Sequence, residues 1–452
     1  MPMQFYVQAG GRLTGVIRVP GDKSISHRSV MLSALADGTT KITGFLQGAD
    51  AISTMNVFRQ LGVKIDGPFD TASDKGCVTV HGVGVNGLKA SATQLDCGNA
   101  GTAMRLLMGL LAGQPFASTL VGDKSLSQRP MKRVADPLSQ MGAVIQTREG
   151  KPPVQLDASG SGLKAIDYVL PMASAQVKSA VILAGLFATG TTTVTEPAPT
   201  RDHTERMLRG FGVDVKVEQA GAGKKVSVAG GQRLTATTID VPADISSAAF
   251  FLVAASIARG SDLTLAHVGV NPTRTGIIDI LKLMGADISL SNHKEVGGEP
   301  VADIRVRSAA LKGIHVPEHL VPLAIDEFPV LFVAAACAKG KTVVTGAEEL
   351  RVKESDRIQM MADGLQKLGV PATPTPDGMI IDGNDSDDLV FGSGVVDSDG
   401  DHRIAMAFAV AALRAAGPIT ILDTENVATS FPGFTEFASQ AGLHVESQES
   451  KA

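Results

Sequence analysis

The segment Val19-Pro20-Gly21-Asp22-Lys23-Ser24 begins a pattern that the chain repeats six times. Each start is followed by about three helical turns rich in Ala, Leu, Val, Ile and Met, then a glycine, then a β-forming run such as Lys41-Ile42-Thr43. From one start to the next, the spacings are 76, 75, 71, 84 and 75 residues. A spacing this regular predicts one supersecondary unit built six times. The starts are Pro20, Asp96, Pro171, Pro242, Asp326 and Asp401.

Each repeat also contains a second predicted helix, which ends at a glycine and is followed by a strand. The first helix of each repeat is apolar on all sides, as in 248–258 and 328–338, so other elements must enclose it. These apolar runs are shorter than the about 20 residues that a membrane span needs. The glycines that end the second helices are Gly62, Gly142, Gly212, Gly285, Gly369 and Gly442.

Length and composition indicate a large α/β protein. A chain of 452 residues exceeds what one core usually supports, so we expect two domains of three repeats each. The net charge of -5 gives no general attraction to nucleic acid or anionic lipid. The cysteines, Cys77, Cys97 and Cys337, are odd in number and irregularly spaced, which favours a reducing cytoplasm over a disulfide framework or a zinc site. No secretory signal is recognisable, and loops are expected at 383–394 and 447–452.

Polar and basic residues gather where the predicted helices begin. A helix N-terminus presents unpaired N–H groups and a partial positive charge, so it attracts anions, and basic side chains strengthen the effect. Singly, each of these residues has an ordinary interpretation as a helix cap or a solvated surface residue. If the six repeats converge, however, the cations line one cleft suited to substrates with several phosphate and carboxylate groups. The residues are Lys23, Ser24, Arg28, Asn99, Gly101, Thr102, Arg105, Arg129, Ser174, Gln176, Arg201, Arg351, Lys353, Arg357 and Arg403.

Taken together, seven stretches resemble motifs of the 5-enolpyruvylshikimate-3-phosphate synthase family, in order and over essentially the whole chain. They are PGDKSISHR (20–28), GNAGT (98–102), RPM (129–131), SAQVKSA (174–180), IDE (325–327), LRVKESDR (350–357) and DHRIAM (401–406). The segments MASAQ (172–176), TRDHTE (200–205) and ATSFP (428–432) resemble the class II branch in particular.

The resemblance implies a fold and a reaction. The fold is the enolpyruvyl transferase fold, in which two similar domains each have three βαβαββ-type repeats whose buried helices point at the interdomain cleft. Domain one would comprise 1–20 and 241–452, and domain two 21–240. The reaction adds the 5-hydroxyl of shikimate 3-phosphate to C2 of phosphoenolpyruvate while C3 is protonated, and the tetrahedral intermediate then loses phosphate. The implied partners are these two substrates, without cofactor, metal, nucleic acid or membrane, and the protein would be a cytoplasmic monomer.

The resemblance also implies three catalytic residues, Asp326, Glu354 and Lys23. A hydroxyl is a poor nucleophile at neutral pH, so a carboxylate must take its proton, and Asp326 matches the family's base. The alternative is that Asp326 only caps a helix over 327–339. C3 needs an acid that later takes its proton back, a role for a carboxyl kept protonated by its surroundings. Glu354 is the candidate, and the alternative is an ordinary salt-bridged helix residue.

Two sets of substrate ligands follow from the same resemblance. Guanidinium groups suit the planar carboxylate of phosphoenolpyruvate. Asn99 and Arg105 are expected to shape a helix start. His27, His203 and His402 lack metal-ligand spacing, so they are expected either to support the residues that bind substrate or to be structural. The ligands of shikimate 3-phosphate would be Lys23, Ser24, Arg28, Ser174, Ala175, Gln176, Arg201, Asp326 and Lys353. Those of phosphoenolpyruvate would be Lys23, Gly101, Arg129, Gln176, Arg357 and Arg403.

Two positions depart from family patterns. Thr429 stands where another branch has a lysine on the phosphoenolpyruvate side. Gly101 stands where class II members known to tolerate glyphosate have alanine, so glyphosate is expected to inhibit this chain.

Three alternatives belong to other classes. UDP-N-acetylglucosamine enolpyruvyl transferase has a catalytic Cys in the loop that corresponds roughly to 113–129, where this sequence has none. RNA 3′-terminal phosphate cyclase needs a nucleophilic His and a nucleotide site, and the acidic charge balance disfavours RNA. A non-catalytic repeat scaffold would explain the period but not the gathering of Asp326, Glu354 and the cations at helix starts.

Overall fold

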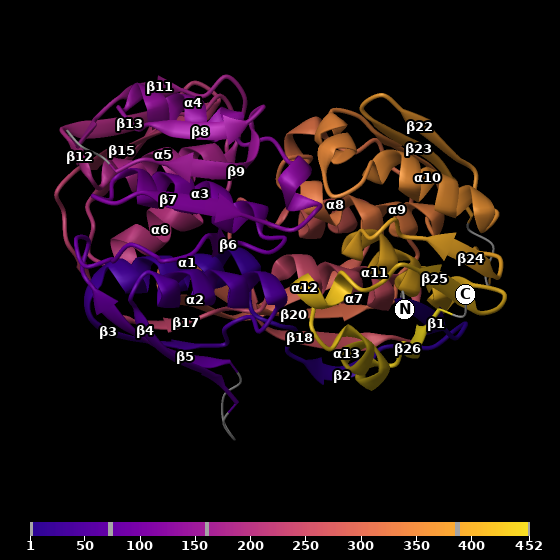
Figure 1. Cartoon of the computed structure of the whole chain (residues 1–452). Helices are drawn as coiled ribbons and strands as arrows, with labels where there is room; N and C mark the ends of the chain where they lie inside the picture. The colour runs from indigo at the N-terminus through magenta and orange to yellow at the C-terminus, as the bar shows by residue number, and fades with distance from the viewer. Residues whose placement is uncertain (1–2, 71–75, 159–161, 385–388, 451–452) are drawn as a thin grey trace. The chain divides into compact units, whose positions relative to one another are not determined.

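The computed structural model describes residues 3–70, 76–158, 162–384 and 389–450 of an α/β protein. Contacts divide the chain into two compact units, which are described separately (Figure 1). Unit 1 comprises Met1–Pro20, Pro242–Lys294 and Pro300–Ala452, and unit 2 comprises Gly21–Val241 and Glu295–Glu299. Each has three main sheets among the described residues.

The second repeat shows the topology that recurs through unit 2. A strand leads into a buried helix, the next strand returns parallel to the first, and an outer helix and a hairpin follow. Parallel neighbours need such a crossover, so the buried helix covers one face of its sheet. The elements are β6 (Leu95–Asp96), α3 (Gly101–Ala112), β7 (Ser118–Val121), η1 (Leu126–Gln128), α4 (Lys132–Gln140), β8 (Ile145–Arg148) and β9 (Lys151–Leu156).

The third repeat has the same order, with a small extra strand pair. Its elements are β10 (Leu163–Lys164), β11 (Asp167–Val169), α5 (Ala175–Gly185), β12 (Ala188–Thr189), β13 (Thr191–Thr195), α6 (His203–Gly210), β14 (Val215–Ala220) and β15 (Gly223–Ala229).

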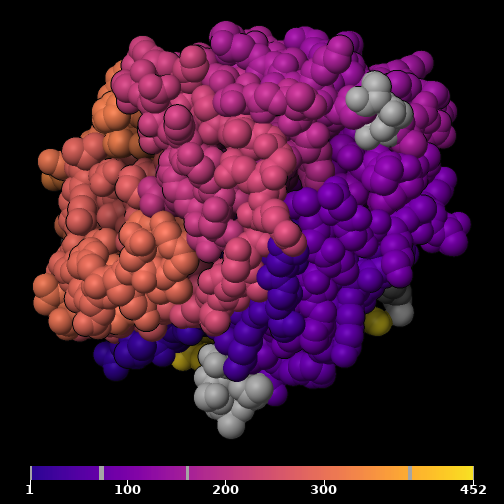
Figure 2. All heavy atoms as spheres, turned by 90° about the vertical axis from the view of Figure 1, so that its left-hand side faces the viewer, coloured from indigo at the N-terminus to yellow at the C-terminus, as the bar shows by residue number. Residues whose placement is uncertain are grey.

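The opening strand of the first repeat, β17, comes from the C-terminal end of the Gly21–Val241 segment of unit 2. β17 pairs in parallel with β3, from Thr238 beside Lys41 to Asp240 beside Thr43. Figure 2 shows this seam, where the pink chain near residue 240 runs along the indigo chain. The elements are α1 (Lys23–Leu35), β3 (Ala36–Thr43), α2 (Ala49–Gln60), β4 (Lys64–Phe69), β5 (Cys77–Val83), β16 (Leu234–Thr235) and β17 (Thr238–Asp240).

Unit 1 closes in the same way with strands from the N-terminus. β2 (Thr14–Ile17) supplies the first strand of the fourth repeat, and β1 (Met3–Val7) lies between β25 and β26 in the sixth. Unit 1 stops at Pro20 and resumes at Pro242. The two ends of this break lie side by side, since the Asp244 N–H donates to the Pro20 carbonyl at 2.9 Å.

The elements of unit 1 follow the same scheme. The fourth repeat has α7 (Ile245–Ile257), β18 (Asp262–Gly269), α8 (Gly276–Leu283), β19 (Asp287–Val296) and β20 (Glu299–Arg307). The fifth has η2 (Glu318–Leu320), η3 (Ile325–Glu327), α9 (Phe328–Ala336), β21 (Gly340–Val344), η4 (Glu348–Val352), α10 (Arg357–Lys367), β22 (Ala372–Thr375) and β23 (Gly378–Gly383). The sixth has β24 (Gly394–Asp397), α11 (His402–Ala411), η5 (Ala412–Arg414), β25 (Ile419–Leu422), α12 (Val427–Ser430), α13 (Phe434–Ala441) and β26 (Val445–Glu449).

The apolar helices form the core of each unit, as predicted. All 13 residues of α7 are buried, and α7, α9 and α11 contact one another in every pairing. Each buried Leu, Val, Ile or Phe side chain contributes about 1.5–3 kcal/mol through its removal from water. The polar groups at the starts of these helices are therefore held by a rigid framework.

The predicted helix ends are confirmed, whereas one predicted loop is wrong. Positive φ angles between 84° and 112° occur at Gly62, Gly142, Gly212, Gly285, Gly369 and Gly442. The tail expected as a loop from Ser447 is instead part of β26 up to Glu449, because its backbone pairs with β1. Of the predicted loop 383–394 and the tail, residues 385–388 and 451–452 lie outside the described residues. Within the described part of the chain, no helix is long and apolar enough to cross a membrane.

Candidate active site

In unit 2, the start of α1 carries the first group of predicted site residues. Asp22 caps the helix by accepting the Ile25 N–H at 2.8 Å, which leaves Lys23 and Ser24 in the first turn. Lys23 Nζ lies 3.3 Å from Oδ2 of Asp50, a buried residue at the start of α2. The Asp50 carboxylate holds the Lys23 ammonium group in place, and this pairing was not predicted from the sequence.

Arg28 lies one turn further along α1 and is buried. Burial lowers its pKa to about 10, with the nearby Glu205 acting in the opposite direction, so the guanidinium stays charged at neutral pH. Its neighbour His27 is neutral, since burial and the nearby Lys23 and Arg28 lower its pKa to about 3. His27 Nδ1 lies 2.8 Å from Thr54 Oγ1.

The starts of α3 and α5 come together in unit 2. Arg105 donates to the side-chain oxygen of Gln176, and the Gln176 amide donates to Thr102 Oγ1 at 2.9 Å. Since arginine only donates, the Gln176 oxygen must face Arg105, which fixes the orientation of the amide. Arg105 also donates to the Pro130 carbonyl at 3.1 Å. Arg105 therefore links the starts of α3 and α5, whereas the sequence predicted that it would shape only one helix start.

Gly101 and Arg129 are neighbours in the same region. A Cβ added at Gly101 would lie 3.1 Å from Arg129 Nη1 and 3.5 Å from Arg105 Nη1. Arg129 also donates to Asn99 Oδ1 at 3.0 Å. Two guanidinium groups thus approach a helix start that has no side-chain cap. This arrangement suits a phosphate or carboxylate.

The remaining predicted residues of unit 2 lie at two further helix starts. Ser174 caps α5 by accepting the Val177 N–H at 3.4 Å, and Ala175 and Gln176 form its first turn. Arg201 lies two residues before α6 and acts electrostatically on Arg28.

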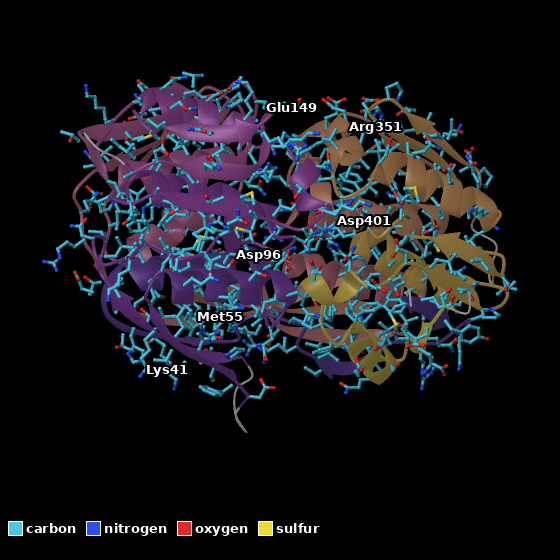
Figure 3. All side chains as sticks on the ribbon, viewed as in Figure 1. Lys41, Met55, Asp96, Glu149, Arg351 and Asp401 are labelled. Atoms are coloured by element: carbon cyan, nitrogen blue, oxygen red, sulfur yellow. The ribbon has the colours of Figure 1, made fainter. Side chains whose placement is uncertain are left out.

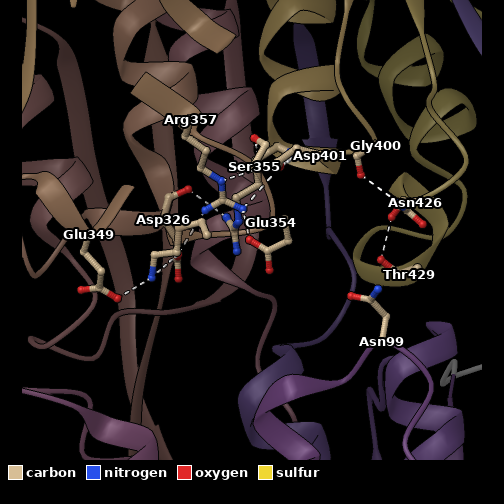
Figure 4. Close-up of polar contacts among 12 residues, drawn as sticks. Asn99, Asp326, Glu349, Glu354, Ser355, Arg357, Gly400, Asp401, Asn426 and Thr429 are labelled. Atoms are coloured by element: carbon tan, nitrogen blue, oxygen red, sulfur yellow. Dashed lines mark hydrogen bonds and ion pairs between the residues drawn. The ribbon is translucent and has the colours of Figure 1, made fainter. Parts of the chain in front are cut away.

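Unit 1 holds the second group of predicted residues, around Arg357 (Figure 4). Arg357, the first residue of α10, is buried, and its guanidinium contacts three carboxylates. It lies 2.8 Å from Asp401 Oδ2, 2.6 Å from Glu354 Oε2 and 3.4 Å from Asp326 Oδ1. Burial alone would lower its pKa, but these carboxylates outweigh burial and raise it. Arg357 is thus permanently charged and organises the carboxylates around it.

Asp326 sits between two cations. Besides Arg357, Lys353 Nζ lies 3.6 Å from Asp326 Oδ1, and Arg403 Nη1 donates to the Asp326 backbone carbonyl at 3.0 Å. Asp326 lies in the 3-10 turn η3 before α9, and the residue that precedes α9 is Glu327. Its side chain therefore faces Lys353 and Arg357, and the expected helix 327–339 is instead Phe328–Ala336.

Asp401 was part of a predicted motif but received no role. It caps α11 by accepting the Arg403 N–H at 2.9 Å, and it accepts the Ser355 hydroxyl at 3.1 Å (Figure 3 labels it). Burial alone would raise its pKa, but the charge of Arg357 outweighs burial and lowers it. Asp401 therefore anchors both Arg357 and Arg403.

A buried chain of polar contacts behind Asp326 was also missed. Glu327 accepts a very short hydrogen bond from Ser246, and Arg274 donates to Ser246 Oγ at 2.8 Å and to Asp244 at 3.2 Å. These residues come from separate parts of the chain, so their contacts become visible only in the folded structure. Among the described residues, no group of three or more His, Cys, Asp or Glu could hold a metal ion.

Comparison with known proteins identifies the family. The family model described as EPSP synthase (3-phosphoshikimate 1-carboxyvinyltransferase) matches residues 7–437. The chain belongs to the EPSP synthase family. It is therefore an enolpyruvyl transferase of the shikimate pathway, and these findings do not favour UDP-N-acetylglucosamine enolpyruvyl transferase.

Individual relatives agree with this family. A 3-phosphoshikimate 1-carboxyvinyltransferase of Alkalilimnicola ehrlichii is 64% identical over 98% of this chain and 96% of its own length. That of Methylococcus capsulatus is 62% identical over 98% of both chains. The structure of EPSP synthase from Acinetobacter baumannii has a TM-score of 0.90 at 57% identity and covers 99% of this chain and 100% of its own. The enolpyruvyl transferase NikO from Streptomyces tendae, with a TM-score of 0.77 over all of both chains, shares the fold at 18% identity. The predicted fold class is confirmed.

Proposed function

We propose that the protein transfers the enolpyruvyl group of phosphoenolpyruvate to the 5-hydroxyl of shikimate 3-phosphate and releases phosphate. The observation that carries this assignment is the carboxylate of Asp326 between Lys353 and Arg357 at the start of a buried helix. A carboxylate in that setting can accept a hydroxyl proton, while the cations bind the anionic substrates. The family and its relatives support the same reaction.

In the proposed first step, Asp326 takes the proton of the 5-hydroxyl as its oxygen bonds to C2 of phosphoenolpyruvate. C3 receives a proton from Glu354 in the same addition. In the second step C3 returns a proton, the double bond re-forms, and phosphate leaves from C2. Lys23 stabilises the charge that develops on the leaving phosphate.

Glu354 needs a trigger to act as an acid. Glu354 Oε2 lies 2.6 Å from Arg357 Nη2, so the carboxyl is engaged with a cation before substrate binds. When the carboxylate of phosphoenolpyruvate binds Arg357, it competes with Glu354 for the same guanidinium. Glu354 would then be released from Arg357 and able to approach C3. Substrate binding would thereby prepare the acid.

The ligand assignments of the sequence analysis are part of this proposal. Shikimate 3-phosphate would contact Lys23, Ser24, Arg28, Ser174, Ala175, Gln176, Arg201, Asp326 and Lys353. Phosphoenolpyruvate would contact Lys23, Gly101, Arg129, Gln176, Arg357 and Arg403. We further propose a cytoplasmic monomer. Cys77, Cys97 and Cys337 are free thiols in the structure, which suits a reducing compartment.

A phosphate-release assay with each substrate omitted in turn tests the reaction. Release that requires both shikimate 3-phosphate and phosphoenolpyruvate is expected. Calorimetric titration with shikimate 3-phosphate and with UDP-N-acetylglucosamine provides a second criterion. Binding of the latter alone, or no release with both substrates, would overturn the proposal.

A further inference from the structure

The first turn of α6 makes buried contacts that the reaction above does not use. Three consecutive residues contact two other elements: His203 contacts the first residue of β20, and Thr204 and Glu205 both contact α5. His203 Nδ1 lies 2.7 Å from Glu299 Oε1, Thr204 donates to Ser179 Oγ at 2.8 Å, and Glu205 lies 2.7 Å from Lys178. Thr204 and Ser179 lie in the motifs TRDHTE (200–205) and SAQVKSA (174–180), but no role follows for them from the sequence.

The Lys178 ion pairs fix α6 against α5. Lys178 Nζ lies 3.0 Å from Glu196 as well as 2.7 Å from Glu205, and all three side chains are buried. Burial alone would lower the pKa of Lys178, but the two carboxylates outweigh burial and raise it. Removing one partner of a buried pair is strongly unfavourable, so the first turn of α6 has a fixed position relative to α5. Thr204 and Ser179 share that fixed position.

Arg28 of α1 uses these two hydroxyl groups as acceptors. Its Nε donates to Thr204 Oγ1 at 2.7 Å, its Nη2 to Ser179 Oγ at 3.1 Å, and its Nη1 to the Ser24 carbonyl at 3.0 Å. A guanidinium is planar and its five N–H groups form a rigid fork, so three bonds determine the plane. Two N–H groups are not used by these bonds, and their directions are fixed by the other three.

The Thr204 hydroxyl does two things that an apolar side chain of the same shape cannot. It accepts the Arg28 Nε–H and donates to Ser179, which in turn accepts from Arg28. Without the hydroxyl, a buried charged N–H loses its acceptor, and the guanidinium must rotate or shift to find another. Such a rotation would turn the two remaining N–H groups away from their original direction.

We propose that Thr204, supported by Ser179, is a positioning residue that fixes the plane of the Arg28 guanidinium for binding shikimate 3-phosphate. This inference rests on the proposed function, in which Arg28 is a ligand of that substrate. Thr204 acts through Arg28 and need not touch the substrate.

The test compares three variants of the full chain by steady-state kinetics. Thr204→Val removes the hydroxyl at nearly constant volume, and Thr204→Ser keeps it. Thr54→Val is the matched control, because Thr54 is also buried and bonds to α1, but through His27 instead of Arg28. Thr204→Val should raise KM for shikimate 3-phosphate by about tenfold, with kcat and KM for phosphoenolpyruvate changed by less than about twofold. Thr204→Ser should stay within about threefold of the wild type, and Thr54→Val should not alter this KM.

Direct binding separates this inference from the function on which it rests. Calorimetric titration should show shikimate 3-phosphate binding to the wild type and about tenfold weaker binding to Thr204→Val. No binding or turnover by the wild type would overturn the proposed function. Three outcomes would overturn the positioning role alone. Thr204→Val could bind shikimate 3-phosphate as tightly as the wild type, or Thr54→Val could raise KM as much as Thr204→Val does. The third outcome is a KM for Thr204→Ser as high as that for Thr204→Val. If Thr204→Val does not fold, Ser179→Ala tests the same plane through Nη2, and an unchanged KM would then count against the inference.

Discussion

At the scale of single residues, the chain places two of the candidate cations against carboxylates from distant parts of the sequence. Lys23 meets Asp50, and Arg357 meets Asp326 and Asp401. The motifs predicted which cations and carboxylates gather at helix starts. They could not predict these pairs, because the two residues of a pair are not separated by a regular spacing that the sequence would reveal. Asp50, Ser246 and Arg274 were missed for that reason.

Asp326 is the residue on which the proposed chemistry depends most. Asp326→Asn should lower kcat by about 10² or more while binding of shikimate 3-phosphate weakens only modestly, since the amide keeps the shape but cannot take a proton. Rapid-quench or phosphate-release kinetics at saturating substrate measures kcat. Asp363→Asn, on the exposed face of α10, is the control and should retain activity. A near wild-type kcat for Asp326→Asn would remove this residue from the mechanism.

Gly101 determines the room beside Arg129, and this leads to a prediction about glyphosate. Glyphosate resembles phosphoenolpyruvate but is longer, so it needs space at the start of α3. An added methyl group would lie 3.1 Å from Arg129 Nη1, which must then shift. We expect competitive inhibition of the wild type against phosphoenolpyruvate, and relief by at least about tenfold in Gly101→Ala, an overpacking effect of about 1–3 kcal/mol.

Inhibition constants measured at several phosphoenolpyruvate concentrations test this prediction. Gly210→Ala is the control, because a Cβ there would make only an ordinary contact of 3.6 Å. A wild-type inhibition constant far above KM for phosphoenolpyruvate would show that other residues, Thr429 among them, already exclude the inhibitor.

At the scale of elements, helix starts and ends were the most predictable features. Apolar surface on all sides predicts a buried helix, and a glycine at positive φ ends the outer helices as expected. A strand after Gly442 was predicted, but its extension through Ser447 to Glu449 was not, because four of the five residues of β26 are exposed and polar, so no alternation marks it. Backbone pairing with β1, which is some 440 positions earlier in the sequence, creates that strand.

Asp401, at the start of α11, links this helix to α10 through Arg357. Although burial acts in the opposite direction, Arg357 holds the folded pKa of Asp401 below the ordinary value of an aspartate carboxyl, so its contribution to stability is present above about pH 4 and is lost as the pH falls through the folded pKa. Asp401→Asn should therefore cost about 3 kcal/mol at pH 7, near the low end of the range for a broken buried pair because Glu354 and Asp326 stay on Arg357.

Urea unfolding of wild type and variant between pH 7 and pH 3 measures the difference, which should shrink below about pH 4. Asp382→Asn, which breaks an exposed pair with Lys341 at 3.6 Å, should change stability by less than about 1 kcal/mol at every pH. A pH-independent difference for Asp401→Asn would show that its charge does not matter.

At the scale of the whole molecule, the repeat period predicted two sets of three repeats, and the chain does form two compact units. The division into domains at residues 20 and 241 came from the family resemblance and not from the period. What the period cannot reveal is that each unit is closed by a strand from elsewhere, as with β17 and β1. Strand exchange between repeats leaves the spacing of the apolar helices unchanged.

Both units carry cations at helix starts, among them Arg28 and Arg129 in unit 2 and Lys353 and Arg403 in unit 1. The proposed ligand sets include residues of both units for each substrate, so bound substrates would link the two units. We expect the radius of gyration from small-angle scattering to decrease when shikimate 3-phosphate and glyphosate are added together. Sulfate at equal ionic strength is the control. An identical radius with and without the two ligands would contradict the prediction.

The narrow break at residues 20 and 242 makes unit 2 an insertion that could be cut out of the gene. A Cβ placed on Gly21 would lie 3.1 Å from Val241, so the two ends of the insert are adjacent. Pro20 and Asp244, bonded across the break, could equally be joined by a short peptide. The obstacle is Glu295–Glu299, which belongs to unit 2 although the chain on both sides of it belongs to unit 1. A gene split at these points would leave His203 without Glu299, so a two-gene version of this enzyme would first need a substitute for that carboxylate.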